Sequence, residues 1–213
     1  MTQSLTTHTL DAHLAGAHGS ANPSLDLLDT RRSVPSRLLQ APGPDDSQLL
    51  RMLQSAVRVP DHGKRVPFRF LRIAGDARHA LGEVLAHRAR ERDATVSDAA
   101  LEKDRHRFAQ APLVIGVLAA QGDDDTIPRQ ERLLSAGCVC FALLQAAQAY
   151  GFGAQWLTGW PAYDDTIRAR LGVAADEVIA GFIHIGTPGM LAPERHRPDP
   201  RELLSEWVAE GTP

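Results

Sequence analysis

The chain has 213 residues, of which 43% are hydrophobic and 23% are charged, and this is the composition of an ordinary globular protein. The formal net charge of −3 argues against a general nucleic-acid-binding protein, which usually carries a basic stripe. No apolar run approaches the roughly 18 residues of a membrane span, and the N-terminus lacks the pattern of a secretory signal. We therefore expect a cytoplasmic protein with no nucleic-acid or membrane partner.

The first part of the chain mixes threonine, histidine, alanine and glycine without apolar periodicity, so residues 1–22 are predicted to be a mobile extension. His8, His13 and His18 recur at intervals of five, which scatters them around a helix and disfavours a metal site. A single domain is predicted to occupy residues 23–213.

Helix signals begin at Pro23, which opens a short helix with three leucines on one side. Asp45 or Asp46 can cap a second helix that runs to about Arg58. The remaining predicted elements are a loop at 59–67, a strand at 68–74, helices at 77–92 and 97–110, a strand at 112–120, a long helix at 129–150, a strand from about 153, a short helix before Gly172 and a strand at 177–188. This order predicts an α+β or α/β layer fold with one sheet.

Arg31, Arg32 and Ser33 follow the first predicted helix and bring two guanidinium groups and a hydroxyl together. A guanidinium fork matches two phosphate oxygens, so this segment is a candidate phosphate clamp. The alternative is a helix C-terminus whose arginines offset the helix dipole and face water. The segment taken alone favours that alternative.

The loop between Pro60 and Pro67 places Asp61, His62 and Lys64 on a stiff segment before a strand. Rigidly held loops often carry binding residues, so His62 and Lys64 are candidate ligand contacts. A surface turn in which Asp61 caps its own backbone explains the same residues.

Trp156, Leu157, Thr158 and Gly159 end a predicted strand and offer an apolar wall, a hydroxyl and a close backbone approach. The two glycines just before this strand do not form a dinucleotide fingerprint, because here the glycines follow a helix and precede a strand. A tryptophan packed into the core fits the segment equally well.

The sequence contains no nucleophile elbow, P-loop, zinc-protease motif or cysteine set at zinc spacing. If the chain is an enzyme, a bound cofactor is expected to supply its chemistry. Cys138 and Cys140 lie in an apolar run, where we expect two buried thiols in a reducing cytosol instead of a strained disulfide.

Three of these segments occur in the same order in one known family. They are Arg31-Arg32-Ser33 after a short helix, VPDHGK about thirty residues later, and YGFGAQWLTG after an alanine-rich helix. The chain resembles the FMN-dependent nitroreductases over residues 23 to about 200, and most closely their compact bacterial subgroup. The resemblance implies an α+β, three-layer fold with a mostly antiparallel central sheet flanked by helices. It also implies an intertwined homodimer with FMN at the subunit interface.

The resemblance implies eight cofactor-binding residues, with the flavin N5 atom carrying the chemistry in place of a side chain. They are Arg31, Arg32 and Ser33 from one subunit, Arg58 and His62 from its partner, and Trp156, Leu157 and Thr158 on the other side of the flavin. Arg31 is the first choice for the FMN phosphate. Residues 146–151 match a segment assigned to nicotinamide cofactor binding. Leu157 stands where relatives carry a basic residue, so one flavin or substrate contact is expected to be absent.

The activity implied by the resemblance is that of an FMN-dependent oxidoreductase. It would pass hydride from NAD(P)H through the flavin to a nitroaromatic, a quinone or a similar small acceptor by a ping-pong mechanism. Two alternatives stay open at this point. One is a flavoenzyme of the same fold that dehydrogenates a specialised metabolite, and the other is a flavin-binding sensor or interaction module without reductase activity.

Overall fold

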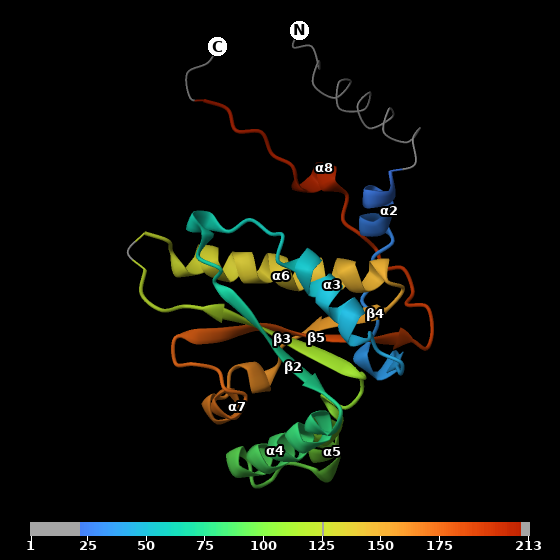
Figure 1. Cartoon of the computed structure of the whole chain (residues 1–213), viewed down its shortest axis with the longest axis vertical. Coiled ribbons are helices and arrows are strands. Elements are labelled where there is room, and N and C mark those ends of the chain that lie inside the picture. The colour runs from blue at the N-terminus through green and yellow to red at the C-terminus, as the bar shows by residue number, and fades with distance from the viewer. Residues whose placement is uncertain (1–21, 125, 210–213) are drawn as a thin grey trace.

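The structure is a computed structural model that describes residues 22–124 and 126–209 (Figure 1). The predicted extension at 1–22, with its three histidines, lies outside these residues except for Asn22. The Asn22 side chain accepts hydrogen bonds from the backbone N–H groups that open the first helix, α2 (Pro23–Asp29).

In the described residues five strands form one sheet, and helices precede, separate and follow them. The strands are β1 (Leu39–Gln40), β2 (Phe68–Ala74), β3 (Leu113–Ala120), β4 (Gly153–Leu157) and β5 (Glu177–Pro188). The other α-helices are α3 (Asp46–Ala56), α4 (Asp76–Arg92), α5 (Asp98–His106), α6 (Arg129–Ala149), α7 (Asp165–Arg170) and α8 (Pro200–Leu203). Short 3₁₀ turns are η1 (Ser36–Leu38), η2 (His62–Lys64) and η3 (Trp160–Ala162).

Every ladder of the sheet is antiparallel, which confirms the predicted sheet type. The strand order is β1-β5-β3-β2, and β4 pairs with β5. β3 pairs along one edge of β5. On the other edge of β5, β4 and β1 pair one after the other along the strand. Gly153 lies opposite Gly186, and Leu39 lies opposite Pro188 two residues further along β5.

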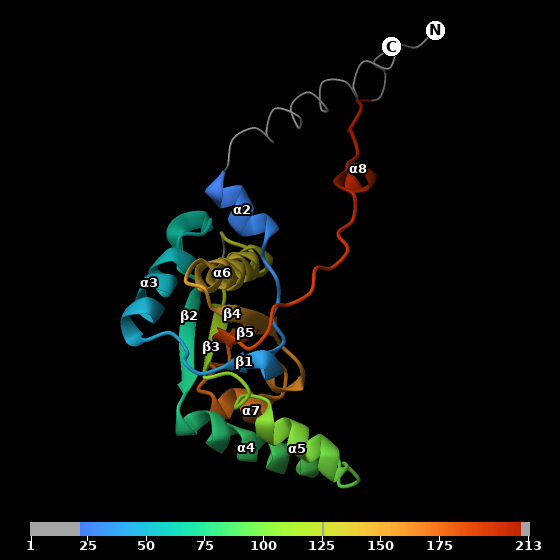
Figure 2. The same cartoon turned by 90° about the vertical axis from the view of Figure 1, so that its right-hand side faces the viewer.

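Helices cover both faces of the sheet, so the predicted three-layer α+β architecture is confirmed (Figures 1 and 2). On one face α3 and α6 bury Met52, Val139 and Leu143 against Ile183 of β5. On the other face α4, α7 and η3 pack around an edge-to-face pair of Phe108 and Phe182. β3 is buried along almost its whole length because it lies between these two cores.

Local chemistry explains where the predicted helices begin and end. The Asp45 side chain accepts from the Gln48 backbone while the Gln48 side chain accepts from the Asp45 backbone, which closes a capping box at the start of α3. Gly151, with φ of +80°, follows the end of α6 in the left-handed conformation that glycine adopts without strain.

The long helix α6 corrects one expectation. Cys140 is buried, and burial raises the pKa of its thiol to about 12. Cys138 is exposed, so the prediction that both thiols are buried was wrong for Cys138. Among the described residues, α6 is the one helix long and apolar enough to span a membrane by length and composition. Half of that stretch is buried inside the protein, as in a core helix.

Candidate functional site

Four arginines and a serine converge beyond the end of α2. Arg31, Arg32 and Ser33 come from the segment after this helix, and Arg195 and Arg197 come from the segment after β5. Together with Pro193 they line a small pocket of about 40 Å³. The chain therefore joins the predicted clamp to a second basic segment far away in the sequence.

Among the described residues, this arginine cluster (Arg31, Arg32, Arg195 and Arg197) has more positive charge than its ion pairs balance. Glu194 forms an ion pair with Arg32 and lies 3.6 Å from Arg197. Burial and the charges of Arg197, Arg32 and Arg195 lower the pKa of Arg31. Its Nη1 donates a weak hydrogen bond of 3.4 Å to Ser33 Oγ. A bound phosphate would relieve this repulsion, since guanidinium groups bind phosphate oxygens in charge-assisted pairs.

Arg31 and Arg32 of the arginine cluster were predicted from the sequence, whereas Arg195 and Arg197 were not. Both lie in the segment PERHRPDP, which has no regular secondary structure before α8. In the sequence, the one feature that pointed to them was the density of basic residues in a proline-rich tail. The position of this tail follows only from the structure, in which the end of β5 lies beside η1. The Gly189 backbone N–H donates to the Leu38 carbonyl at 2.8 Å. This hydrogen bond holds the start of the tail close to the segment that carries Arg31 and Arg32.

β4 connects this cluster to the predicted flavin wall. The Val34 N–H donates to the Ala154 carbonyl at 3.0 Å, so the clamp segment runs along the outer edge of β4. Thr158 lies four residues beyond Ala154, which corresponds to about 13 Å in an extended strand. The candidate phosphate clamp and the predicted flavin wall thus lie at opposite ends of one strand edge.

Of the predicted wall residues (Trp156, Leu157 and Thr158), Trp156 and Leu157 present their side chains to opposite faces of the sheet. Trp156 packs on the α6 side, where its ring covers Gly181 and approaches Gly137, and its Nε1 donates to the Ala180 carbonyl at 3.1 Å. Leu157 lies opposite Phe182, on the other face of the sheet. Alternation along the strand explains this difference. A ligand at the β4 edge therefore meets one of the two side chains and the backbone between them.

The predicted partner residues lie at the far end of α6. His62 Nδ1 is 2.7 Å from Glu131 Oε2, in the first turn of this helix, and both side chains are largely exposed. Arg58 is exposed beyond the end of α3. Next to them Pro60, Ser135 and Cys138 line a pocket of about 220 Å³. Ser135 Oγ donates to the Pro60 carbonyl at 2.7 Å and so ties the loop to α6.

The length of α6 separates these two groups of predicted site residues within one chain. Gln148, near its C-terminal end, donates to Thr30 Oγ1 at 2.9 Å and to the Leu27 carbonyl at 3.0 Å. Glu131 and Gln148 are about 25 Å apart along the helix at 1.5 Å per residue. The structure therefore brings Arg31, Arg32 and Ser33 together with the β4 edge, and it leaves His62 at a distance.

The segment expected to bind a nicotinamide cofactor, residues 146–151, ends α6 beside the arginine cluster. Gln148 from this segment, together with Leu144 and Phe152, lines a pocket of about 180 Å³ that also includes Arg32. Its nicotinamide role stays a prediction. Among the described residues, no group of three or more His, Cys, Asp or Glu side chains is arranged to hold a metal ion.

Comparisons with known proteins give a consistent result. Residues 28–187 match the Nitroreductase family. The chain is 36% identical over 183 residues to the "Putative NAD(P)H nitroreductase YdjA" of Escherichia coli strain K12, which covers 85% of this chain and 98% of that protein.

Solved structures show the same fold at lower sequence identity. A nitroreductase-like family protein from Bacillus cereus superposes with a TM-score of 0.74 at 20% identity, over 90% of this chain and 98% of that one. A structure from Desulfovibrio desulfuricans in complex with FMN superposes with a TM-score of 0.69 at 22% identity, over 89% of this chain and 100% of that one.

Proposed function

Because the chain belongs to the nitroreductase family, we propose that it is an FMN-dependent oxidoreductase that passes hydride from NAD(P)H to a small acceptor. Nitroaromatics and quinones are the acceptor classes we propose. Bound FMN would supply the hydride-accepting and hydride-donating chemistry, so no side chain has to act as a nucleophile. The FMN held by the similar structure from Desulfovibrio desulfuricans supports this choice of cofactor.

The arginine cluster is the observation that carries this proposal. Arg31, Arg195 and Arg197 line a small pocket, and in the described part of the chain Glu194 is the carboxylate that forms ion pairs with the cluster. Burial and its basic neighbours lower the pKa of Arg31. These residues would hold the FMN phosphate, with the Ser33 hydroxyl as a further hydrogen-bond donor. Arg32 is already paired with Glu194 and is expected to contribute less.

The edge of β4 would position the ring system of the same ligand. The Ala154 carbonyl points away from β5 toward Val34, and alternation of backbone groups directs those of Trp156 to the same outer edge. Backbone donors and acceptors placed there can form hydrogen bonds with the polar edge of a planar heterocycle. We propose that NAD(P)H and the acceptor bind in turn to the same face of this ring system, as a ping-pong cycle requires.

A homodimer would bring the two separated halves of the site together. Leu134, Cys138 and Phe141 form an exposed stripe on α6 at i, i+4 and i+7, and Leu134 is 60% exposed. Antiparallel packing of this α6 stripe against its copy would place Arg58 and His62 of each chain near the arginine cluster of the other. We propose the reducing cytoplasm as its compartment, where the free thiols of Cys138 and Cys140 would stay reduced.

The first test is the visible absorbance spectrum of the purified protein, followed by heat release of the chromophore. Oxidised flavin absorbs at about 370 and about 450 nm, and we expect it to be released as FMN with one flavin for each chain. NADH and NADPH should then bleach the bound chromophore, and a nitroaromatic or a quinone should restore its colour. A colourless protein that takes up no added FMN would contradict the proposal.

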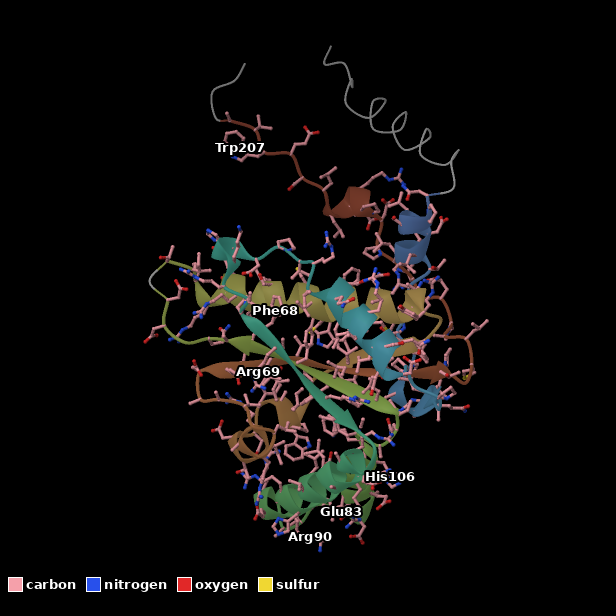
Figure 3. All side chains as sticks on the ribbon, viewed as in Figure 1. Phe68, Arg69, Glu83, Arg90, His106 and Trp207 are labelled. Atoms are coloured by element: carbon pink, nitrogen blue, oxygen red, sulfur yellow. The ribbon has the colours of Figure 1, made fainter. Side chains whose placement is uncertain are left out.

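Variants of the arginine cluster test the assignment of the phosphate. Arg31→Gln and Arg197→Gln each remove a charge-assisted hydrogen bond of about 1.5–3 kcal/mol, so FMN affinity should fall by roughly tenfold to a hundredfold. Arg90→Gln is the matched control, because Arg90 is an exposed arginine on α4 at the opposite end of the molecule from α2 (Figure 3). An equal loss of FMN affinity in all three variants would contradict the assignment.

A further inference from the structure

A buried carboxylate links α5 to the turn that follows β4. Asp104 is 6% exposed, and its Oδ1 accepts hydrogen bonds from Arg107 Nε at 3.0 Å and from Arg107 Nη2 at 2.6 Å. Trp160 Nε1 approaches the same carboxylate at 3.2 and 3.3 Å. Asp104 therefore holds a guanidinium group and an indole ring in fixed positions relative to each other.

The geometry leaves one nitrogen of Arg107 beside the flavin wall. Its Nε and Nη2 atoms are used by Asp104, whereas Nη1 lies only 3.3 Å from the position that a Cβ atom would take on Gly159. Gly159 has φ of +86°, so the turn depends on glycine for its backbone conformation and for this close approach. The Arg107 side chain is 24% exposed, so a ligand at the turn can reach it.

The charge of Arg107 also affects a buried side chain, that of His184. His184 on β5 is buried, and burial together with the charge of Arg107 lowers its pKa to about 4. The nearby histidine is thus neutral at pH 7 and does not oppose the guanidinium charge. A second guanidinium, that of Arg92, stacks over the Trp160 ring at 4.8 Å and helps to hold the ring in place.

We propose that Arg107 is a cofactor-contacting residue, which Asp104 orients so that its Nη1 group faces the ring end of the flavin site at Thr158–Gly159. This inference rests on the proposed function, since it assumes FMN at the β4 edge. Arg107 lies at the other end of that edge from the arginine cluster, so it would act on the ring system and not on the phosphate. A fixed positive charge there favours the reduced flavin, which carries more negative charge than the oxidised form.

The test compares FMN affinity and the midpoint potential of bound FMN in the wild type and in four variants. Arg107→Gln removes the charge, and Arg107→Lys keeps the charge without the guanidinium fork. Arg105→Gln is the control, because Arg105 lies two residues away on α5 and pairs with Glu83 and Glu102 on the surface. The double variant Asp104→Asn with Arg107→Gln removes both charges, so it leaves no buried carboxylate without a cation.

We expect Arg107→Gln and the double variant to keep FMN affinity within about threefold, because the phosphate contacts are intact. In Arg107→Gln the affinity for reduced relative to oxidised FMN should fall about tenfold, which corresponds to a midpoint potential about 30 mV more negative for a two-electron couple. The double variant loses an anion together with the cation, so its potential should shift in the same direction but by less. Arg107→Lys should recover part of this shift, and Arg105→Gln should show none.

An FMN-loaded Arg107→Gln protein with an unchanged potential would overturn the role of Arg107 and leave the proposed function intact. An equal shift in Arg105→Gln would overturn it too, because the effect would then be one of general surface charge. A wild-type protein that takes up no FMN would overturn both proposals.

Discussion

His62 Nδ1 lies 2.7 Å from Glu131 Oε2 at the first turn of α6, while the arginine cluster lies beyond the last turn of the same helix. A helix of this length does not bend back on itself, so one chain cannot bring both groups to one ligand. If both groups contact one flavin, as we propose, a second copy of the chain must supply one of them.

Complementation between two damaged chains is the first prediction. One chain carries Arg31→Ala with Arg197→Ala, and the other carries Arg58→Ala with His62→Ala. In a mixed dimer one site receives both intact halves and the other site receives neither. We expect differently tagged, co-expressed chains to bind one flavin for each mixed pair, while each doubly substituted homodimer binds FMN weakly. Failure to recover any flavin in the mixed pair would contradict a site shared between chains.

The fold was largely predictable because its strands and helices carry strong local patterns. The alternation in FRFLRIA defines β2 as Phe68–Ala74, and the apolar run ending at Ala120 defines a strand buried on both faces. β1 was not predicted, because two residues carry no periodicity. Leu39 and Gln40 form a strand only because β5 extends as far as Pro188 and offers them an unpaired edge.

The candidate site was less predictable, because its residues meet through tertiary structure. Arg31 and Arg32 were visible as a local excess of charge, whereas Arg195 and Arg197 belong to a tail with no element of its own. Asp104 was placed on a helix, but helical position alone does not show that its carboxylate meets the indole N–H of a residue in a later turn. The exposure of Cys138 was missed because an apolar run does not tell which face of a helix a partner will cover.

Crosslinking at Cys138 is the second prediction. Val139 is the middle residue of α6 (Arg129–Ala149), so antiparallel pairing of two copies places their Cys138 side chains close to the two-fold axis. A short bismaleimide should therefore join two chains, and Cys138→Ser should abolish the product. Cys140→Ser is the control and should crosslink like the wild type, because the Cys140 thiol is buried with a pKa raised to about 12. A crosslinked product in Cys138→Ser would contradict the predicted packing.

The third prediction concerns Gly181, which supports the Trp156 ring. A Cβ atom at Gly181 would overlap Nε1 of Trp156, so Gly181→Ala should displace the ring from the β4 edge. We expect the free energy of unfolding to fall by about 1–3 kcal/mol, as for other overpacked sites, and FMN affinity to fall with it. Urea unfolding and FMN titration measure the two effects.

Gly116→Ala is the control for this change, because Gly116 also lies in a buried strand. Its added Cβ would meet Leu71 Cβ at 3.4 Å, an ordinary contact, so the free energy of unfolding should change by less than about 1 kcal/mol. Equal losses of stability in the two variants would show that the Trp156 contact is not the cause.

The last prediction is a pH dependence of stability that originates at His184. Burial, with a smaller contribution from the charge of Arg107, lowers its pKa from 6.5 to about 4. Between these values the unfolded chain binds a proton that the folded chain does not, so this contribution to stability is full above pH 6.5 and decreases as the pH falls. From pH 7 to pH 5 the loss from this one group is about 2 kcal/mol.

His184→Leu tests this contribution, because it replaces the ring with an apolar side chain that cannot titrate. Between pH 7 and pH 5 the free energy of unfolding of this variant, measured in urea, should decrease less than that of the wild type, by about this amount. A parallel decrease in the two proteins would mean that other groups cause the acid sensitivity and that His184 does not contribute to it.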